Sequence, residues 1–141
     1  MSESIGSGPT PDDITRFITT TWPETVVAEA MGATFFSLDP KSWPNFATIV
    51  TTDEHDTGAP SNLTARPAVF RLNIGVGKAT FERLAAAWGA EPDLAELDRL
   101  LPHPVYAKQR WISILNPTWS TFETVVEPLI EEAHARLAKS G

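Results

Sequence analysis

The 141-residue chain contains no cysteine, which excludes a disulfide-stapled scaffold, thiol catalysis and zinc sites that need thiolates. Hydrophobic residues make up 42% of the sequence and charged residues 21%, so the chain can build one ordinary hydrophobic core and is not disordered as a whole. Eleven basic residues against eighteen acidic ones give a net charge of -7, which disfavours nucleic-acid binding, because that binding relies on clustered Lys and Arg.

The sequence predicts one domain, from residue 10 to residue 139, behind a flexible N-terminal segment of residues 1–9 that is rich in Ser, Gly and Pro. No apolar run approaches the roughly 18 residues that a membrane-spanning helix needs, and no secretory signal is recognisable. We therefore expect a cytoplasmic protein without a membrane anchor.

Local signals predict a short N-terminal helix followed by strands. Thr10 suits the N-cap, Pro11 suits the first helical position, and the helix should end by Trp22 because Pro23 follows it. Met31-Gly32 favours a hairpin turn. Runs of β-branched and aromatic residues predict strands over residues 25–30, 34–38, 46–51, 69–74 and 111–115.

Two helical segments are predicted between the last two of these strands. In the first, apolar residues recur with helical spacing at Phe81, Leu84, Ala85 and Trp88. Gly89 should end this helix. Pro92 should open a second, shorter helical segment whose apolar residues are Leu94, Leu97 and Leu101.

A long helix is predicted to close the chain. Ser120 and Glu123 fit a capping box at its start, and Pro128 predicts a kink or a restart, since an interior proline removes a backbone hydrogen bond. The fold class is therefore α+β, with a single antiparallel sheet of about five strands packed by N-terminal, middle and C-terminal helices.

Two segments of the second half carry a family resemblance. Residues 67–77 read PAVFRLNIGVG, and residues 102–117 read PHPVYAKQRWISILNP. With the helix between them, they resemble an uncharacterised family of the domain-of-unknown-function type over most of the chain. The order of an F-R-L strand, a helix, a K-x-x-W-I strand and a closing helix is also distantly similar to the MmcQ/YjbR-like proteins. This resemblance implies a double-wing α+β fold, for which DNA binding has been suggested, and it brings no catalytic residues.

The segment from His103 to Trp111 is the strongest candidate site, because it places an imidazole, a phenol, an amide, two cations and an indole between two prolines and a strand. In the strand over residues 69–74, the period of two separates Arg71 and Asn73 from the apolar face. If the strand of Trp111 pairs with this one, all these groups share one opening. The predicted ligand-binding residues are Arg71, Asn73, His103, Tyr106, Gln109 and Trp111.

Other suggestive patterns favour structural interpretations. The stretch Gly75-Val76-Gly77-Lys78 lacks the spacing of a phosphate loop, so its glycines are predicted to be turn residues with positive φ, with anion binding at the helix start as the alternative. The acidic run over residues 53–56 is interpreted as a solvated loop rather than a cation site. His134 is expected to be exposed. We therefore expect no metal and no cofactor.

Three functions remain open at this point. The favoured one is a noncatalytic module that binds a small molecule or peptide; the second is an enzyme with His103 as general acid or base, helped by Tyr106 or Asp98. The third is DNA binding, which the net charge disfavours. It would use a local basic patch formed by Arg66, Arg71, Lys108 and Arg110. The expected partners are a small molecule or another protein, with the oligomeric state left open.

Overall fold

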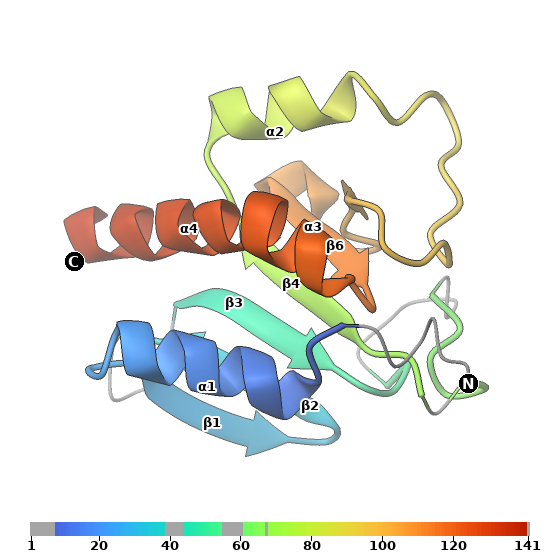
Figure 1. Ribbon diagram of the computed structural model, residues 1–141. Coiled ribbons are helices and arrows are strands. Elements are labelled where there is room, and N and C mark those ends of the chain that lie inside the picture. Colours follow the sequence, from blue (N-terminus) through green and yellow to red (C-terminus); the bar gives the residue numbers. More distant parts are fainter. Residues whose placement is uncertain (1–7, 39–43, 55–60, 67, 141) are drawn as a thin grey trace.

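The computed structural model describes residues 8–38, 44–54, 61–66 and 68–140. Its centre is one antiparallel sheet of six strands in the order β1-β2-β3-β4-β6-β5 (Figure 1). The strands are β1 (Val26–Ala30), β2 (Ala33–Ser37), β3 (Asn45–Val50), β4 (Arg71–Gly75), β5 (Leu101–Pro102) and β6 (Trp111–Leu115). The predicted α+β class with a single antiparallel sheet is confirmed, with one strand more than expected.

The helices lie mainly on one face of this sheet. In Figure 1, α1 (Pro11–Thr21) lies in front of the first strands and α4 (Glu127–Ser140) in front of the central ones. The N-terminal helix begins as predicted, because Thr10 and Asp13 form a reciprocal capping box. The shorter α2 (Lys78–Ala85) lies beyond α4 in Figure 1. The turn that follows α2 is held by a hydrogen bond from the indole Nε1 of Trp88 to the Leu100 carbonyl at 2.9 Å.

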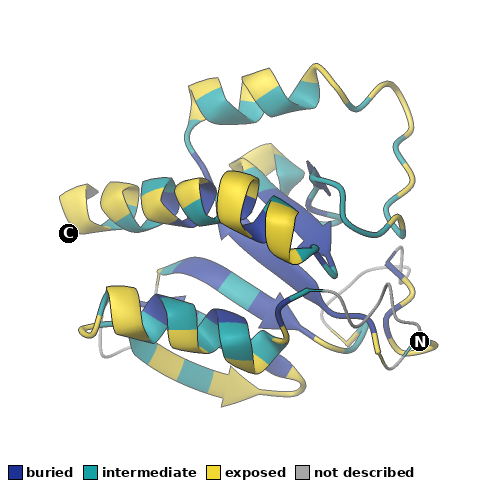
Figure 2. Ribbon diagram, in the orientation of Figure 1, coloured by how far each residue is buried: buried dark blue, intermediate teal, exposed yellow. Residues whose placement is uncertain are grey.

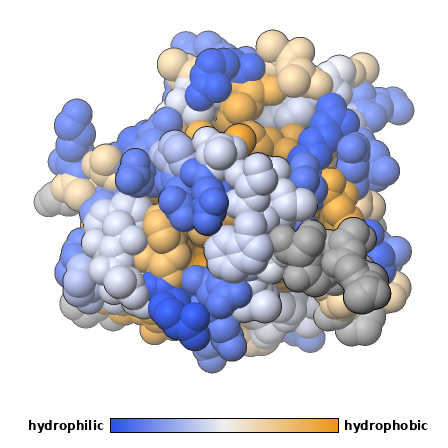
Figure 3. Space-filling model, viewed as in Figure 1, coloured by the Kyte–Doolittle hydropathy of each residue, from blue (hydrophilic) through white to orange (hydrophobic). Residues whose placement is uncertain are grey.

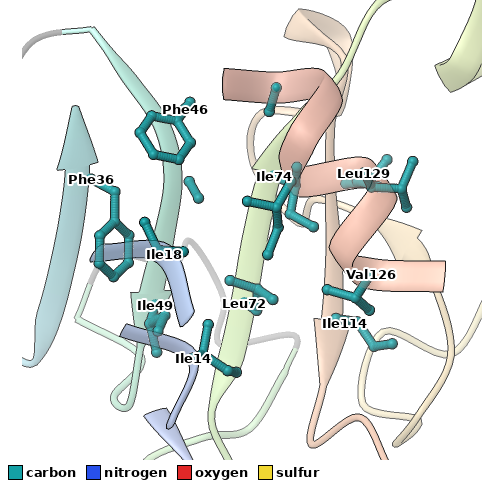
Figure 4. Packing of buried hydrophobic residues seen from close by; sticks show 14 of the residues in the cluster. Ile14, Ile18, Phe36, Phe46, Ile49, Leu72, Ile74, Ile114, Val126 and Leu129 are labelled. Carbon is teal, nitrogen blue, oxygen red and sulfur yellow. The ribbon is translucent and has the colours of Figure 1, made fainter. Parts of the chain in front are cut away.

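The main core fills the space between these helices and the sheet. Figure 4 shows α1 contributing Ile14 and Ile18, and the last helical region contributing Val126 and Leu129. They meet the apolar side chains of four strands, which include Phe36, Phe46, Ile49, Leu72, Ile74 and Ile114. Figure 2 accordingly shows the central strands buried and the outer sides of the helices exposed, and Figure 3 shows hydrophilic side chains over much of this helical face, with hydrophobic ones between them.

The other face of the sheet is also covered, by connecting segments rather than by α-helices. A second apolar cluster lies there, made of Ala33, Val50, Leu63, Val69, Leu101 and Leu115. The alternation in β4 therefore sorts its side chains as predicted, with Leu72 and Ile74 in the main core and Arg71 and Asn73 on the opposite face. Both faces of the central strands are buried, so Arg71 and Asn73 are not at the surface.

The helix predicted after Pro92 is wrong. Leu97 forms a parallel bridge with Leu115, and Leu101 instead begins β5, which pairs with β6. The spacing of the leucines fits a helix, but in an extended conformation this segment can form backbone hydrogen bonds with the edge of β6. That pairing outweighs the local helical propensity.

The start of the closing helix is also corrected. Thr118, not Ser120, is the N-cap, and its hydroxyl accepts from the Thr121 amide. A three-residue α3 (Trp119–Thr121) leads into a π-helical stretch over Phe122–Val126, and α4 follows. The irregularity falls just before Pro128, in line with the predicted restart, because a proline cannot donate a helical hydrogen bond.

Some predictions concern residues at the edge of what the structure describes. Of the predicted N-terminal segment, residues 1–7 lie outside the described residues; Pro9 is buried, and the Gly8 backbone lies close to Pro117. Among the described residues, no helix is both long and apolar enough to cross a membrane.

Candidate functional site

A cavity of about 370 Å³ opens on the sheet face opposite α1 and α4, and all six predicted site residues line it. Arg71 and Asn73 come from β4, Trp111 from β6, and the other three from the connection between β5 and β6. Sequence reasoning missed four further lining residues, which are Phe35, Asn45, Thr48 and Val50.

Strand register explains why these side chains meet. In the antiparallel ladder, Asn73 lies directly opposite Thr48 on one side and Ser113 on the other. Directly opposite residues point to the same face of a sheet, so the three form a polar row across β3, β4 and β6. The predicted pairing of the Trp111 strand with the Arg71 strand is confirmed, with Gly75 opposite Trp111.

Hydrogen bonds fix the polar floor of the cavity. Asn73 Oδ1 accepts from Arg71 Nε at 2.8 Å and from the Ser113 hydroxyl at 2.7 Å, while Asn73 Nδ2 donates to Thr48 Oγ1 at 2.9 Å. Arg71 Nη1 donates to the Ser61 hydroxyl at 3.1 Å. Each bond holds its neighbour's rotamer, so the floor is rigid before anything binds.

Arg71 brings a positive charge into this buried floor, where its side chain is only 1% exposed. Its charge acts on nearby groups. Burial raises the pKa of Asp53, but hydrogen bonds from the Thr64 and Leu63 amides and the Arg71 charge outweigh it and hold that pKa below its usual value. The Asp53 carboxylate is therefore an anchor for the following loop rather than part of a solvated acidic run. His55 and Asp56 lie outside the described residues.

His103 is buried beside the cavity as a neutral ring. Its Nδ1 accepts from the backbone amides of Val105 at 2.9 Å and Tyr106 at 3.0 Å, so the neutral imidazole carries its proton on Nε2. Burial, and secondarily the Arg71 charge, lower the pKa of His103 to about 3. With one nitrogen accepting backbone bonds and the other protonated, His103 can donate a hydrogen bond but has no lone pair left for a general base.

The suggested helpers of an enzymatic His103 are placed for other tasks. The Asp98 carboxylate accepts from the Thr118 amide at 2.9 Å and so supports the start of α3. Tyr106 lies next to the imidazole, with ring centroids 5.1 Å apart, and is 52% exposed. The geometry makes Tyr106 a rim residue.

Trp111 forms a wall of the cavity because Gly75 lets it approach the backbone. A Cβ at Gly75 would lie 3.1 Å from the indole ring, which is closer than ordinary packing allows. The glycine therefore serves close approach, and the predicted positive φ at Gly75 and Gly77 is wrong: at Gly77, φ is -79°.

The start of α2 is not vacant for an external anion. Glu132 of α4 accepts from the Gly77 amide at 2.8 Å and from the Thr80 hydroxyl at 2.7 Å. The chain's own carboxylate thus occupies the anion position that a helix N-terminus offers.

The proposed basic patch does not form as a surface. Arg71 is buried, and Arg66 donates to the carbonyls of Ser61 and Ala95 at 2.6 and 3.2 Å. Of the four residues, only Lys108 and Arg110 are exposed.

His134 is not exposed, contrary to expectation. Its ring stacks on Trp22 with centroids 4.4 Å apart, and its Nε2 lies 3.1 Å from a Glu24 carboxylate oxygen. The side chain is only 13% exposed, because α4 lies against the end of α1. Among the described residues, no group of three or more His, Asp or Glu side chains could hold a metal ion.

A family model for a family of unknown function, DUF6194, matches residues 9–140. The chain belongs to the DUF6194 family. The predicted membership of a domain-of-unknown-function family is thereby confirmed. No curated protein and no solved structure matches the sequence.

A partial signal for the missed lining residues exists in the sequence. Thr48, Asn73 and Ser113 each stand between two apolar residues of their strand, and these three positions are aligned across the sheet. A shared polar interruption in neighbouring strands indicates a common polar row. Phe35 and Val50, by contrast, look like any core residue until the topology is known.

Proposed function

We propose that this DUF6194 protein is a noncatalytic module that binds a small molecule in the cavity above Asn73. The observation that carries the proposal is a cavity of about 370 Å³ whose polar floor is fixed by hydrogen bonds among Arg71, Asn73, Ser113 and Thr48. Cavities of about 300–1,000 Å³ with a few convergent polar groups and apolar walls are typical of small-molecule sites. The size favours a small molecule over a peptide.

The lining residues indicate the chemistry of the ligand. The Arg71 charge in the floor and the neutral imidazole N–H of His103 favour an acceptor such as a carboxylate or an amide carbonyl. Phe35, Val50 and Trp111 offer apolar surface to the body of the molecule. We therefore propose a ligand with an apolar or aromatic body and one carbonyl or carboxylate group.

The other interpretations of the sequence carry less weight than binding in this cavity. The similarity to the MmcQ/YjbR-like proteins and a cytoplasmic location stay predictions, and the binding proposal rests on neither. DNA binding is disfavoured, because Arg71 is buried and Arg66 bonds to backbone carbonyls. Catalysis by His103 is disfavoured by its tautomer.

Thermal unfolding in the presence of a panel of aromatic carboxylates and amides tests the proposal. A compound that binds only the native state at 100 times its Kd adds about 2.7 kcal/mol. At about 2–4 °C per kcal/mol for a domain near 150 residues, this raises Tm by roughly 5–11 °C. Tyr106→Ala should remove most of that increase, because the phenol lies on the rim.

Lys108→Ala is the matched control. It lies in the same turn, is exposed and does not line the cavity. The proposal predicts the wild-type response in Lys108→Ala. A panel that leaves Tm unchanged throughout, or an increase that survives both Tyr106→Ala and Gln109→Ala, would contradict it.

A further inference from the structure

A second cavity, of about 470 Å³, adjoins the first. Asn45, Gln109 and Trp111 line both cavities, so they form the boundary between the two. The second cavity extends from this boundary to the C-terminal end of α4, where Arg136 and Lys139 line it. The two cavities together offer a longer path than the first alone.

The second cavity differs from the first in charge. Among the described residues that line it, Arg136 and Lys139 are the only charged ones, although the chain as a whole carries a net charge of -7. They are three residues apart on one helix, which places both on the same side. Glu132 approaches Gly77 near Arg136, but its carboxylate is bonded to the Gly77 amide and the Thr80 hydroxyl.

The boundary itself has an unsatisfied group. Asn45 Oδ1 is buried and accepts no hydrogen bond among the described residues. A buried acceptor without a donor is costly. The Asn45 side chain as a whole is half-buried and lines both cavities, so a turn of its amide that presents this oxygen to an N–H or O–H group of a molecule at the boundary is favoured. The ring of Trp111, held close to the Gly75 backbone, gives such a molecule an apolar wall to pass along.

We propose that the ligand is an elongated anion that spans both cavities. Its apolar head lies above Asn73, a donor group of its linker bonds Asn45 Oδ1, and a phosphate or similar anionic group lies between Arg136 and Lys139. This inference rests on the proposed function and adds the second half of the ligand to it.

The test uses a matched series of probes: aryl amides with linkers of increasing length that end either in a phosphate or in a hydroxyl. Binding is measured by calorimetry on the full chain. At low salt, the phosphate form with the best linker should bind about tenfold more tightly than its hydroxyl partner, because charge-assisted hydrogen bonds are stronger than neutral ones. High salt should reduce that advantage, since both cations are exposed.

Two double variants separate a specific site from general attraction. Arg136→Gln/Lys139→Gln should abolish the phosphate advantage, so that the phosphate and hydroxyl probes bind this variant with equal affinity. Arg83→Gln/Lys108→Gln removes the same amount of charge from residues that line neither cavity, and it should keep the advantage.

Each outcome decides between the two proposals. If the hydroxyl probes bind but the phosphate brings no advantage, or if the advantage survives Arg136→Gln/Lys139→Gln, this inference is wrong and the binding module stands. If no probe of the series or of the aromatic panel binds, the proposed function is wrong and this inference with it.

Discussion

Replacing Asn73 with leucine should lower the free energy of unfolding more than most single substitutions do. The side chain is 1% exposed and accepts hydrogen bonds from Arg71 Nε and the Ser113 hydroxyl. Leucine has the same branched shape and the same number of side-chain heavy atoms but no polar atom, so two buried donors lose their acceptor. Thr48, which is half-buried, can turn its hydroxyl to water in the cavity.

The expected cost follows from those two donors. Each buried donor left without a partner costs about 1–3 kcal/mol, so Asn73→Leu should lower the free energy of unfolding by about 2–6 kcal/mol. That is a large share of the roughly 5–15 kcal/mol by which domains are stable. In urea denaturation, with a slope of about 1–3 kcal/mol per molar, the midpoint should fall by roughly 2 M.

A double-mutant cycle checks the reasoning rather than the number alone. Ser113→Ala should destabilise the wild-type protein by about 1 kcal/mol. In the Asn73→Leu background it should cost nothing or restore stability, because it removes a donor that has already lost its acceptor, giving a coupling energy of about 1–2 kcal/mol. Additive effects, or an Asn73→Leu cost below about 1 kcal/mol, would show that the polar floor does not act as one network.

Three further predictions concern groups around the site. His103 has a folded-state pKa near 3, below its unfolded value, so its contribution to stability is complete above about pH 6.5 and is lost as the pH falls towards 3, by up to about 1.4 kcal/mol per pH unit. The free energies of unfolding of wild type and His103→Asn, measured in urea at several pH values, should therefore converge in acid. Parallel curves would contradict this. Glu132→Gln should lower the free energy of unfolding by about 1 kcal/mol in the same assay, and by less in high salt, because the carboxylate accepts from the amide of Gly77, the N-cap of α2. A loss of stability that salt does not change would exclude the charge as its source. Gly75→Ala should displace the Trp111 ring, which fluorotryptophan NMR reports as a shift of one of the five indole signals, and an unshifted Trp111 signal would mean that the ring is not held against that backbone.

Local chemistry made much of the fold predictable. The start of α1 follows from Thr10 and Asp13, whose capping interactions lie within one helical turn, and the β1–β2 hairpin follows from Met31-Gly32, where φ is positive at both residues. The segment after Pro92 was not predictable in this way. The spacing of its leucines is helical, and only the free edge of β6 decides that Leu101 pairs there instead.

The candidate site was predictable to the extent that it depends on alternation and strand pairing. The period of two placed Arg71 and Asn73 on one face, and the pairing of their strand with that of Trp111 placed them beside His103 and Tyr106. The state of the imidazole was not predictable, because it depends on the chain turning back so that two later amides reach Nδ1.

Packing between distant segments explains the remaining errors. His134 has a polar sequence environment, yet Trp22 and Phe46 cover its ring after α1 and α4 come together. Glu132 likewise looks like a solvent-exposed acid of an amphipathic helix. Its role as the cap of α2 depends on a contact with Gly77, 55 positions away in the chain.

The central claim is that a ligand occupies the cavity above Asn73, and nuclear Overhauser contacts test it most directly. The measurement uses the aromatic carboxylate or amide that raises Tm most, bound to the full chain. Protons of the bound compound should show contacts with the indole of Trp111 and the ring of Phe35, which face the cavity from β6 and β2. Contacts confined to other residues, such as the exposed Trp119, would contradict the claim.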